Sequence, residues 1–77
     1  MVSAYILVQT DVGRASSVAE AIRSISGVTT SDDVTGPYDV IVHAHARSMD
    51  ELGRLVMAQI QAVDGITRTL TCPVVHV

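Results

Sequence analysis

The residues of this chain that most resemble a reactive site are His43 and His45, in the run VIVHAHA. Because residues i and i+2 of a strand point to the same face, the two imidazoles could share a metal ion. A zinc site needs three or four ligands, and a catalytic one takes three of them from the protein. The candidates for a third ligand are Cys72 and His76, near the end of the sequence. Whether they meet the two histidines depends on the fold.

The acidic residues do not form a catalytic pair. Asp32 and Asp33 are adjacent, so on a strand their carboxylates point to opposite faces. Asp39 and His43 are separated by about 13 Å along a strand, which is beyond hydrogen-bond reach. The chain also contains no glycine-rich phosphate loop and no serine at a nucleophile elbow. We therefore predict no catalytic residues and no cofactor, and we expect a protein that is not an enzyme.

The turn before the histidines, TGPYD at residues 35–39, is better suited to binding. Gly36 supplies free backbone dihedrals, and Pro37 fixes φ between two strands. Tyr38 offers a ring with a hydroxyl, and Asp39 offers a carboxylate beside exposed turn backbone. This mixture suits a small zwitterion, with Asp39 toward its ammonium and backbone N–H groups toward its carboxylate. The alternative is an ordinary hairpin turn whose aspartate caps local backbone.

The elements that must position these residues follow from hydrophobic periodicity. β-branched and apolar residues mark the first strand, a short polar segment the second, and alternation between two faces the third, while apolar residues recur every three or four positions in two other segments. We predict strands at 2–9, 28–35, 38–46 and 66–77, and helices at about 14–26 and 48–63. Ser48 and Glu51 form a capping box at the start of the second helix. Pro73 removes a backbone donor from the last strand, which predicts a sheet edge or a bulge.

The order βαββαβ predicts an α+β, ferredoxin-like sandwich of the dimeric α+β barrel type. Its four-stranded antiparallel sheet has two helices on one face and leaves the other face open. In the usual strand order the first strand separates the third from the last, so His76 would have to reach across it. We therefore favour His43 and His45 on a polar strand face or in a subunit interface. A metal site and a pH-responsive interface remain as alternatives.

The composition indicates one small domain, residues 1–77, that associates with itself. The chain is 48% hydrophobic, which is more apolar surface than a lone domain of this size hides easily. Its net charge is −3, and its five basic residues are scattered arginines, so no basic patch predicts direct nucleic-acid binding. No apolar run is long enough to span a membrane, and no leader is recognisable, so we expect a cytoplasmic protein. The single cysteine, Cys72, predicts a small buried hydrophobe in a strand.

Three motifs follow one another in the second half of the sequence. They are Thr35-Gly36-x-Tyr38-Asp39 before an apolar strand, Asp50-Glu51-Leu52 at a helix start, and Gly65-Ile66 followed by Thr69-x-Thr71. In this order and spacing, residues 35–75 resemble the effector-binding (RAM) domain of the Lrp/AsnC family of transcriptional regulators. The first half fits more loosely, through AYILVQTDVGR and an S-G-V after the first helix.

The resemblance implies a domain whose sheets pair across a dimer, with dimers that often assemble into octameric or decameric rings. Small effectors, usually amino acids, bind in clefts between dimers. Carried onto this sequence, the ligand-binding residues would be Thr35, Gly36, Tyr38, Asp39, Thr69 and Thr71. Some members also hold the effector's ammonium with an acidic side chain in the second helix, where this chain reads Met57-Ala58-Gln59.

The chain begins at its first strand, without the helix-turn-helix domain that precedes this region in family members. The resemblance is therefore to a stand-alone form, which would modulate transcription indirectly by assembling with full-length Lrp/AsnC regulators. Two other classes share the element order. A cofactor-free monooxygenase-like enzyme would place His43 or His45 in an apolar cavity on the helix side. An ACT-like regulatory domain would bind an amino acid near the loop TDVGR at residues 10–14.

Overall fold

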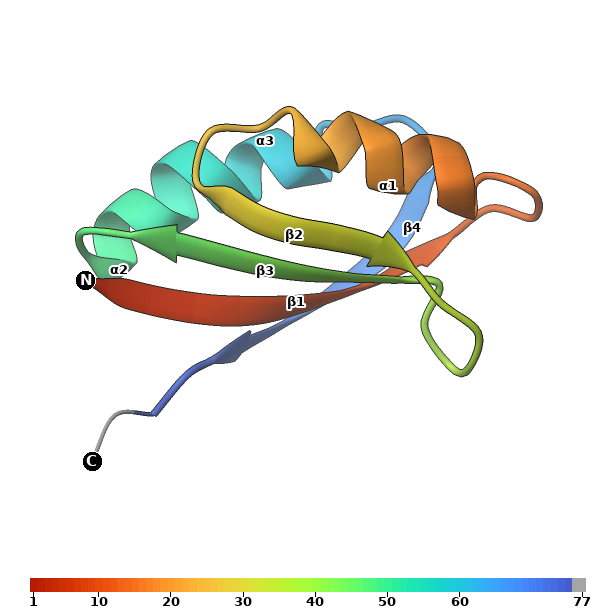
Figure 1. The fold of residues 1–77 in the computed structure, drawn as a ribbon. Helices are drawn as coiled ribbons and strands as arrows, with labels where there is room; N and C mark the ends of the chain where they lie inside the picture. Colours follow the sequence, from red (N-terminus) through yellow and green to blue (C-terminus); the bar gives the residue numbers. More distant parts are fainter. Residues whose placement is uncertain (76–77) are drawn as a thin grey trace.

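A four-stranded antiparallel sheet with its helices on one face forms this chain (Figure 1). The computed structural model describes residues 1–75, apart from the side chain of Leu55. The strands are β1 (Val2–Thr10), β2 (Val28–Asp33), β3 (Val40–Ala46) and β4 (Ile66–Pro73). The helical elements are α1 (Ala15–Arg23), α2 (Met49–Glu51), the π-helical η1 (Leu52–Met57) and α3 (Ala58–Gln61). The predicted βαββαβ, ferredoxin-like fold is confirmed.

The strands lie in the order β2-β3-β1-β4. Val8 of β1 pairs with Val40 of β3 on one side and with Thr69 of β4 on the other. The last strand is therefore separated from the third by the first, as predicted. Pro73 lies on β4, which is an edge strand, and this agrees with its lack of a backbone donor. The prediction that involves His76 lies outside the described residues.

The core lies between the sheet and the helices. Alternate residues of the central strands point to this layer, where Ile6, Val8 and Val42 are fully buried. The stripe predicted for the second helix is confirmed at Leu52, Val56 and Ile60, which are at most 2% exposed. The spacing of four residues between them keeps one side of the helix against the sheet.

The second helix departs from prediction in its hydrogen bonding. It is continuous from α2 through η1 to α3, but its middle is π-helical, and the N–H of Ala58 donates to the carbonyl of Gly53, five residues earlier. Several boundaries also differ, since α1 ends at Arg23, β2 ends at Asp33 and β3 begins at Val40. No helix of the described residues is long and apolar enough to cross a membrane.

The capping box is half as predicted. The hydroxyl of Ser48 accepts a hydrogen bond from the backbone N–H of Glu51 at 3.1 Å. The Glu51 carboxylate accepts from the backbone N–H of Arg47 at 3.5 Å, one residue earlier than the motif predicts. The same carboxylate lies 3.6 Å from the Arg47 Nε. An ion pair therefore replaces the second half of the capping box.

The sheet face opposite the helices carries large exposed apolar side chains in this chain. Tyr5 is 46% exposed, Ile41 37% and Leu70 41%. Each lies on a different strand, and Tyr5 pairs with Cys72 across β1 and β4. Cys72 is exposed, so the prediction of a buried cysteine is wrong for a single copy. The reason is that Cys72 shares the face of Tyr5 and Leu70, which no helix within residues 1–75 covers. We call this surface the open sheet face.

Candidate functional site

The predicted binding turn is fastened to the end of β1. The backbone N–H of Asp39 donates to the Val8 carbonyl at 2.9 Å, and the Asp39 carboxylate accepts from the N–H of Thr10 at 2.8 Å. The Gln9 side-chain amide also donates to the carbonyl of Pro37 at 3.0 Å. Asp39 therefore does cap backbone, though of a neighbouring strand rather than of its own turn. These contacts fix where its carboxylate lies.

The tip of the turn is exposed, because Thr35, Gly36 and Pro37 lie beyond the ends of β2 and β3. Gly36 has a φ of 141°, in the region that side chains avoid, so the turn needs a glycine there. Tyr38 is half-buried next to this tip. The turn thus presents backbone and hydroxyl groups to solvent while its base is held rigidly.

The two predicted threonines lie on the helix side of β4. Thr69 and Thr71 pair with Val8 and Ile6, which point to the core layer. The Gln61 amide donates to the Thr69 hydroxyl at 3.5 Å, and the Thr71 hydroxyl contacts the Met57 sulfur at 3.6 Å. A neutral thioether thus faces Thr71 from the second helix.

The structure does not bring the predicted site residues into one cavity within the chain. β1 lies between β3 and β4, so the turn and the threonines are about 10 Å apart, two strand spacings, at their closest. A shallow hollow of about 230 Å³ lies beside β4, lined by Gln61, Ile66, Thr67, Arg68 and Thr69. Residues 35–39 do not line it. The two groups do share one end of the sheet, where β1 ends and β4 begins.

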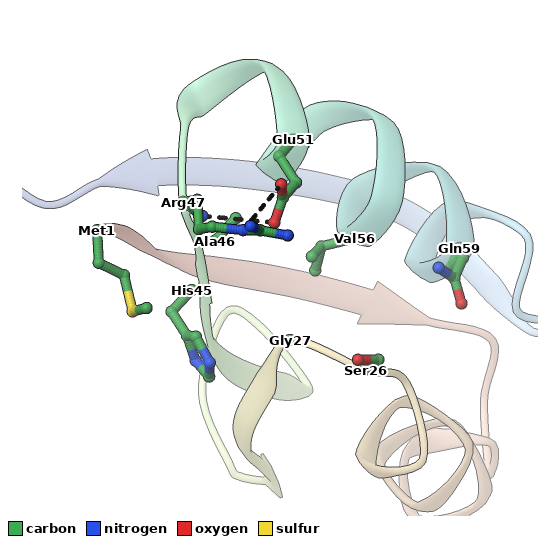
Figure 2. A pocket seen from close by; sticks show the side chains of 9 residues that line it. All are labelled: Met1, Ser26, Gly27, His45, Ala46, Arg47, Glu51, Val56 and Gln59. Atoms are coloured by element: carbon green, nitrogen blue, oxygen red, sulfur yellow. Dashed lines mark hydrogen bonds and ion pairs between the residues drawn. The ribbon is translucent and has the colours of Figure 1, made fainter.

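A larger hollow of about 530 Å³ lies at the opposite end of the sheet, and sequence reasoning missed it. Met1 at the start of the chain, the loop after α1, the end of β3 and the second helix surround it, with further side chains that include Ser26, His45, Arg47, Glu51 and Gln59 (Figure 2). These residues come from four separate parts of the chain. No local motif marks them, although the mixture of charged residues at 47–51 is visible in the sequence.

The histidines do not form a metal site with other described residues. His43 stacks on Tyr5 of the open sheet face, with ring centroids 4.6 Å apart and 13° between the planes. The Nδ1 of His45 lies 2.8 Å from the Thr29 hydroxyl, within hydrogen-bond distance. Among residues 1–75, no three His, Cys, Asp or Glu side chains gather closely enough to hold a metal ion.

The loop after β1 is occupied by contacts with the end of the second helix. The backbone N–H of Asp11 donates to the Gly65 carbonyl at 2.9 Å. The guanidinium of Arg14 lies 3.2 Å from the Asp64 carboxylate. This loop is where an ACT-like domain would bind its ligand, and here it ties two elements together.

Comparisons with known proteins agree with the fold and name the family. A family model described as the Lrp/AsnC ligand binding domain matches residues 3–77. Among curated proteins, PF0250 of Pyrococcus furiosus, named as an uncharacterized HTH-type transcriptional regulator, is 32% identical over 54 residues, 70% of this chain and 36% of that protein. The match thus spans little more than a third of that relative's length.

Solved structures extend the match to the whole fold. The crystal structure of TTHA0845 from Thermus thermophilus has a TM-score of 0.91 and 28% identity, covering 100% of this chain and 96% of that one. The structure of AsnC from E. coli has a TM-score of 0.87 and 26% identity, covering 97% of this chain and 51% of that one. The family model covers nearly every residue of the sequence. This chain therefore belongs to the Lrp/AsnC ligand binding domain family.

Proposed function

We propose that this chain is an effector-sensing domain that binds an amino acid or a similar small metabolite between copies of itself. It would modulate transcription indirectly, by assembling with full-length Lrp/AsnC regulators. The observation that carries the proposal is the family match over residues 3–77, which is to a ligand-binding domain. The curated relative PF0250 is named as an uncharacterized HTH-type transcriptional regulator, and that name favours regulation over catalysis.

The open sheet face supports assembly. A sheet that packs helices on one side only must cover its other side when that side is apolar. Tyr5, Ile41 and Leu70 are more than one-third exposed there, on three adjacent strands. A second copy stacked sheet to sheet would remove all three from water. Dimers, and the octameric or decameric rings formed from them, are the assemblies that the family resemblance implies.

A site between copies would also bring together predicted binding residues that lie apart within one chain. In one chain, β1 lies between the turn at 35–39 and the threonines of β4. A neighbouring copy could bring its own turn, with Thr35, Gly36, Tyr38 and Asp39, against Thr69 and Thr71 of the first. The turn N–H groups and threonine hydroxyls would then hold a carboxylate, and Asp39 would supply the negative charge for an ammonium.

Calorimetric titration with each proteinogenic amino acid tests this proposal. We expect at least one to bind and to raise the melting temperature, because a ligand that binds only the folded state stabilises it. Thr69→Val, which removes a hydroxyl at similar volume, should weaken that binding. Ser16→Ala removes the hydroxyl of an exposed residue of α1, away from the open sheet face and the proposed site, and should leave binding unchanged. If no amino acid binds and none shifts the melting temperature, amino-acid sensing is wrong.

A further inference from the structure

We infer that the larger hollow is a second binding site, which takes a small ligand with a primary ammonium group and a short apolar body. It is separate from the site proposed above. The turn precedes Val40 and the hollow adjoins His45 and Arg47, so the length of β3, about 20 Å, lies between them. Its volume of about 530 Å³ falls within the range of small-molecule sites.

One wall of this hollow is held rigidly by a glycine. Gly27 has a φ of 97°, and a Cβ built on it would lie 2.8 Å from Val56 Cγ2 and 3.1 Å from the His45 carbonyl oxygen. The His45 N–H donates to the Gly27 carbonyl at 2.8 Å. The loop after α1 therefore lies directly against both β3 and the second helix. The cavity is formed before any ligand arrives, which lowers the cost of binding.

The base of the hollow is apolar, because Val56 is 2% and Ala46 5% exposed. Val56 belongs to the π-helical segment η1, and π-helical turns occur often at functional sites. Figure 2 shows these side chains between the loop at Ser26 and Gly27 and the carboxylate of Glu51. A short hydrocarbon group would fit against this base with its polar end toward Glu51.

The Glu51 carboxylate would bind the ammonium group of the ligand. Its side chain is only 28% exposed, and its two contacts with Arg47 are long, at 3.5 Å and 3.6 Å. Charge-assisted hydrogen bonds to carboxylates are usually about 2.7–2.9 Å. The Arg47 side chain is 86% exposed, so its guanidinium can leave the carboxylate at little cost, while the 3.5 Å contact from the Arg47 backbone N–H stays. An ammonium group with three donors would give this half-buried carboxylate a closer partner.

The same chemistry occurs in a simple alkylamine and in an amino acid. In an amino acid, the Arg47 guanidinium would be placed to hold the carboxylate once it leaves Glu51. Three probes of similar shape separate these sources: isoamylamine, L-leucine and isovalerate. Isovalerate lacks the ammonium, so the proposed site should reject it.

The test is a titration of the isotope-labelled full chain followed by two-dimensional amide NMR. We expect isoamylamine to shift the amide signals of Ser26, Gly27 and Glu51 and to leave that of Gly36 unchanged. Glu51→Gln keeps an oxygen for the Arg47 N–H but removes the charge, and it should weaken amine binding about tenfold or more. Asp50→Asn removes a neighbouring carboxylate that pairs with Arg54 outside the hollow, and it should leave amine binding unchanged.

A second variant guards against a folding artefact. Arg47→Gln removes the competitor for Glu51, so it should strengthen isoamylamine binding rather than weaken it. L-leucine that shifts the same signals, with the same loss in Glu51→Gln, would extend the site to amino acids. If L-leucine shifts only the amide signals of residues 35–39 or 69–71, it binds the site proposed in the previous subsection. The isoamylamine titration alone then decides whether the larger hollow is a binding site. The inference is overturned by any of three results: isoamylamine shifts none of the three amide signals, isovalerate shifts them as isoamylamine does, or the Glu51→Gln variant binds isoamylamine as tightly as the unaltered chain.

Discussion

The carboxylate of Asp39 accepts a hydrogen bond from the backbone N–H of Thr10 at 2.8 Å, joining the start of β3 to the end of β1. The contact is partly buried and spans 29 residues of sequence. It holds the base of the turn at 35–39, while the tip of that turn remains exposed. The residue that resembles a ligand contact in the sequence is therefore also a structural anchor.

Removing this anchor should destabilise the fold. Asp39→Ala leaves the Thr10 N–H without its partner, and we expect a loss of about 1–3 kcal/mol in the free energy of unfolding. Asp39→Asn keeps an acceptor oxygen and should recover part of it. Asp33→Ala, at an exposed carboxylate of β2 that pairs with the buried Val40 and so lies off the open sheet face, should change stability by less than about 0.5 kcal/mol. Urea denaturation at one fixed protein concentration measures all three, and an Asp39→Ala variant as stable as the unaltered chain would refute the anchor.

Two glycines provide a matched test of the packing around the larger hollow. Gly27→Ala adds a Cβ that meets Val56 at 2.8 Å in a backbone conformation that alanine avoids, so we expect a loss of at least about 1 kcal/mol. A Cβ at Gly53 would meet no atom within 4 Å, and alanine favours a helix, so Gly53→Ala should gain up to about 1 kcal/mol. The melting temperature should fall in Gly27→Ala and rise in Gly53→Ala. Equal shifts would contradict the described packing.

The open sheet face predicts which exposed apolar residue controls assembly. Leu70→Asp places a charge in the proposed contact and should shift the chain toward single copies, because an unpaired buried charge is costly. Val12→Asp changes a fully exposed apolar side chain in the loop after β1, away from that face, and should leave assembly unchanged. Size-exclusion chromatography with light scattering compares them. Identical masses for both variants and the unaltered chain would exclude this face as the contact.

Cys72 reports on the same surface by its chemistry. Its thiol is exposed in one copy and lies opposite Tyr5 on the open sheet face. If copies stack through that face, a thiol reagent should label Cys72 slowly in the unaltered chain and many times faster in Leu70→Asp. For each protein, the labelling rate in native buffer is divided by the rate in denaturant, where the thiol is fully accessible. Equally fast native labelling in both proteins would argue that the face stays open.

The parts of this structure that sequence reasoning predicted are those governed by short-range periodicity. A period of two places His43 on the face of Ile41, and a spacing of four aligns Leu52, Val56 and Ile60. The strand order followed from the βαββαβ arrangement. Burial that depends on tertiary packing was harder to predict. Cys72 is exposed because no helix in the described part of the chain covers its side of the sheet.

The candidate sites show the same division. The exposed tip of the turn at 35–39 was predictable from Gly36 and Pro37, whereas the bond from Thr10 to Asp39 required the register of β1 against β3. The π-helical segment leaves no mark in the spacing of apolar residues, which also suits an α-helix. The larger hollow combines Met1 with segments near residues 26, 46 and 55, and their meeting depends on tertiary packing.

The central claim is that copies of this chain join through the open sheet face and bind a ligand between them. Sedimentation equilibrium of the unaltered chain tests it most directly, because both the covered face and the shared site require more than one copy. We predict a mass of two chains or a larger even multiple at micromolar concentration. A single species with the mass of one chain would contradict the claim.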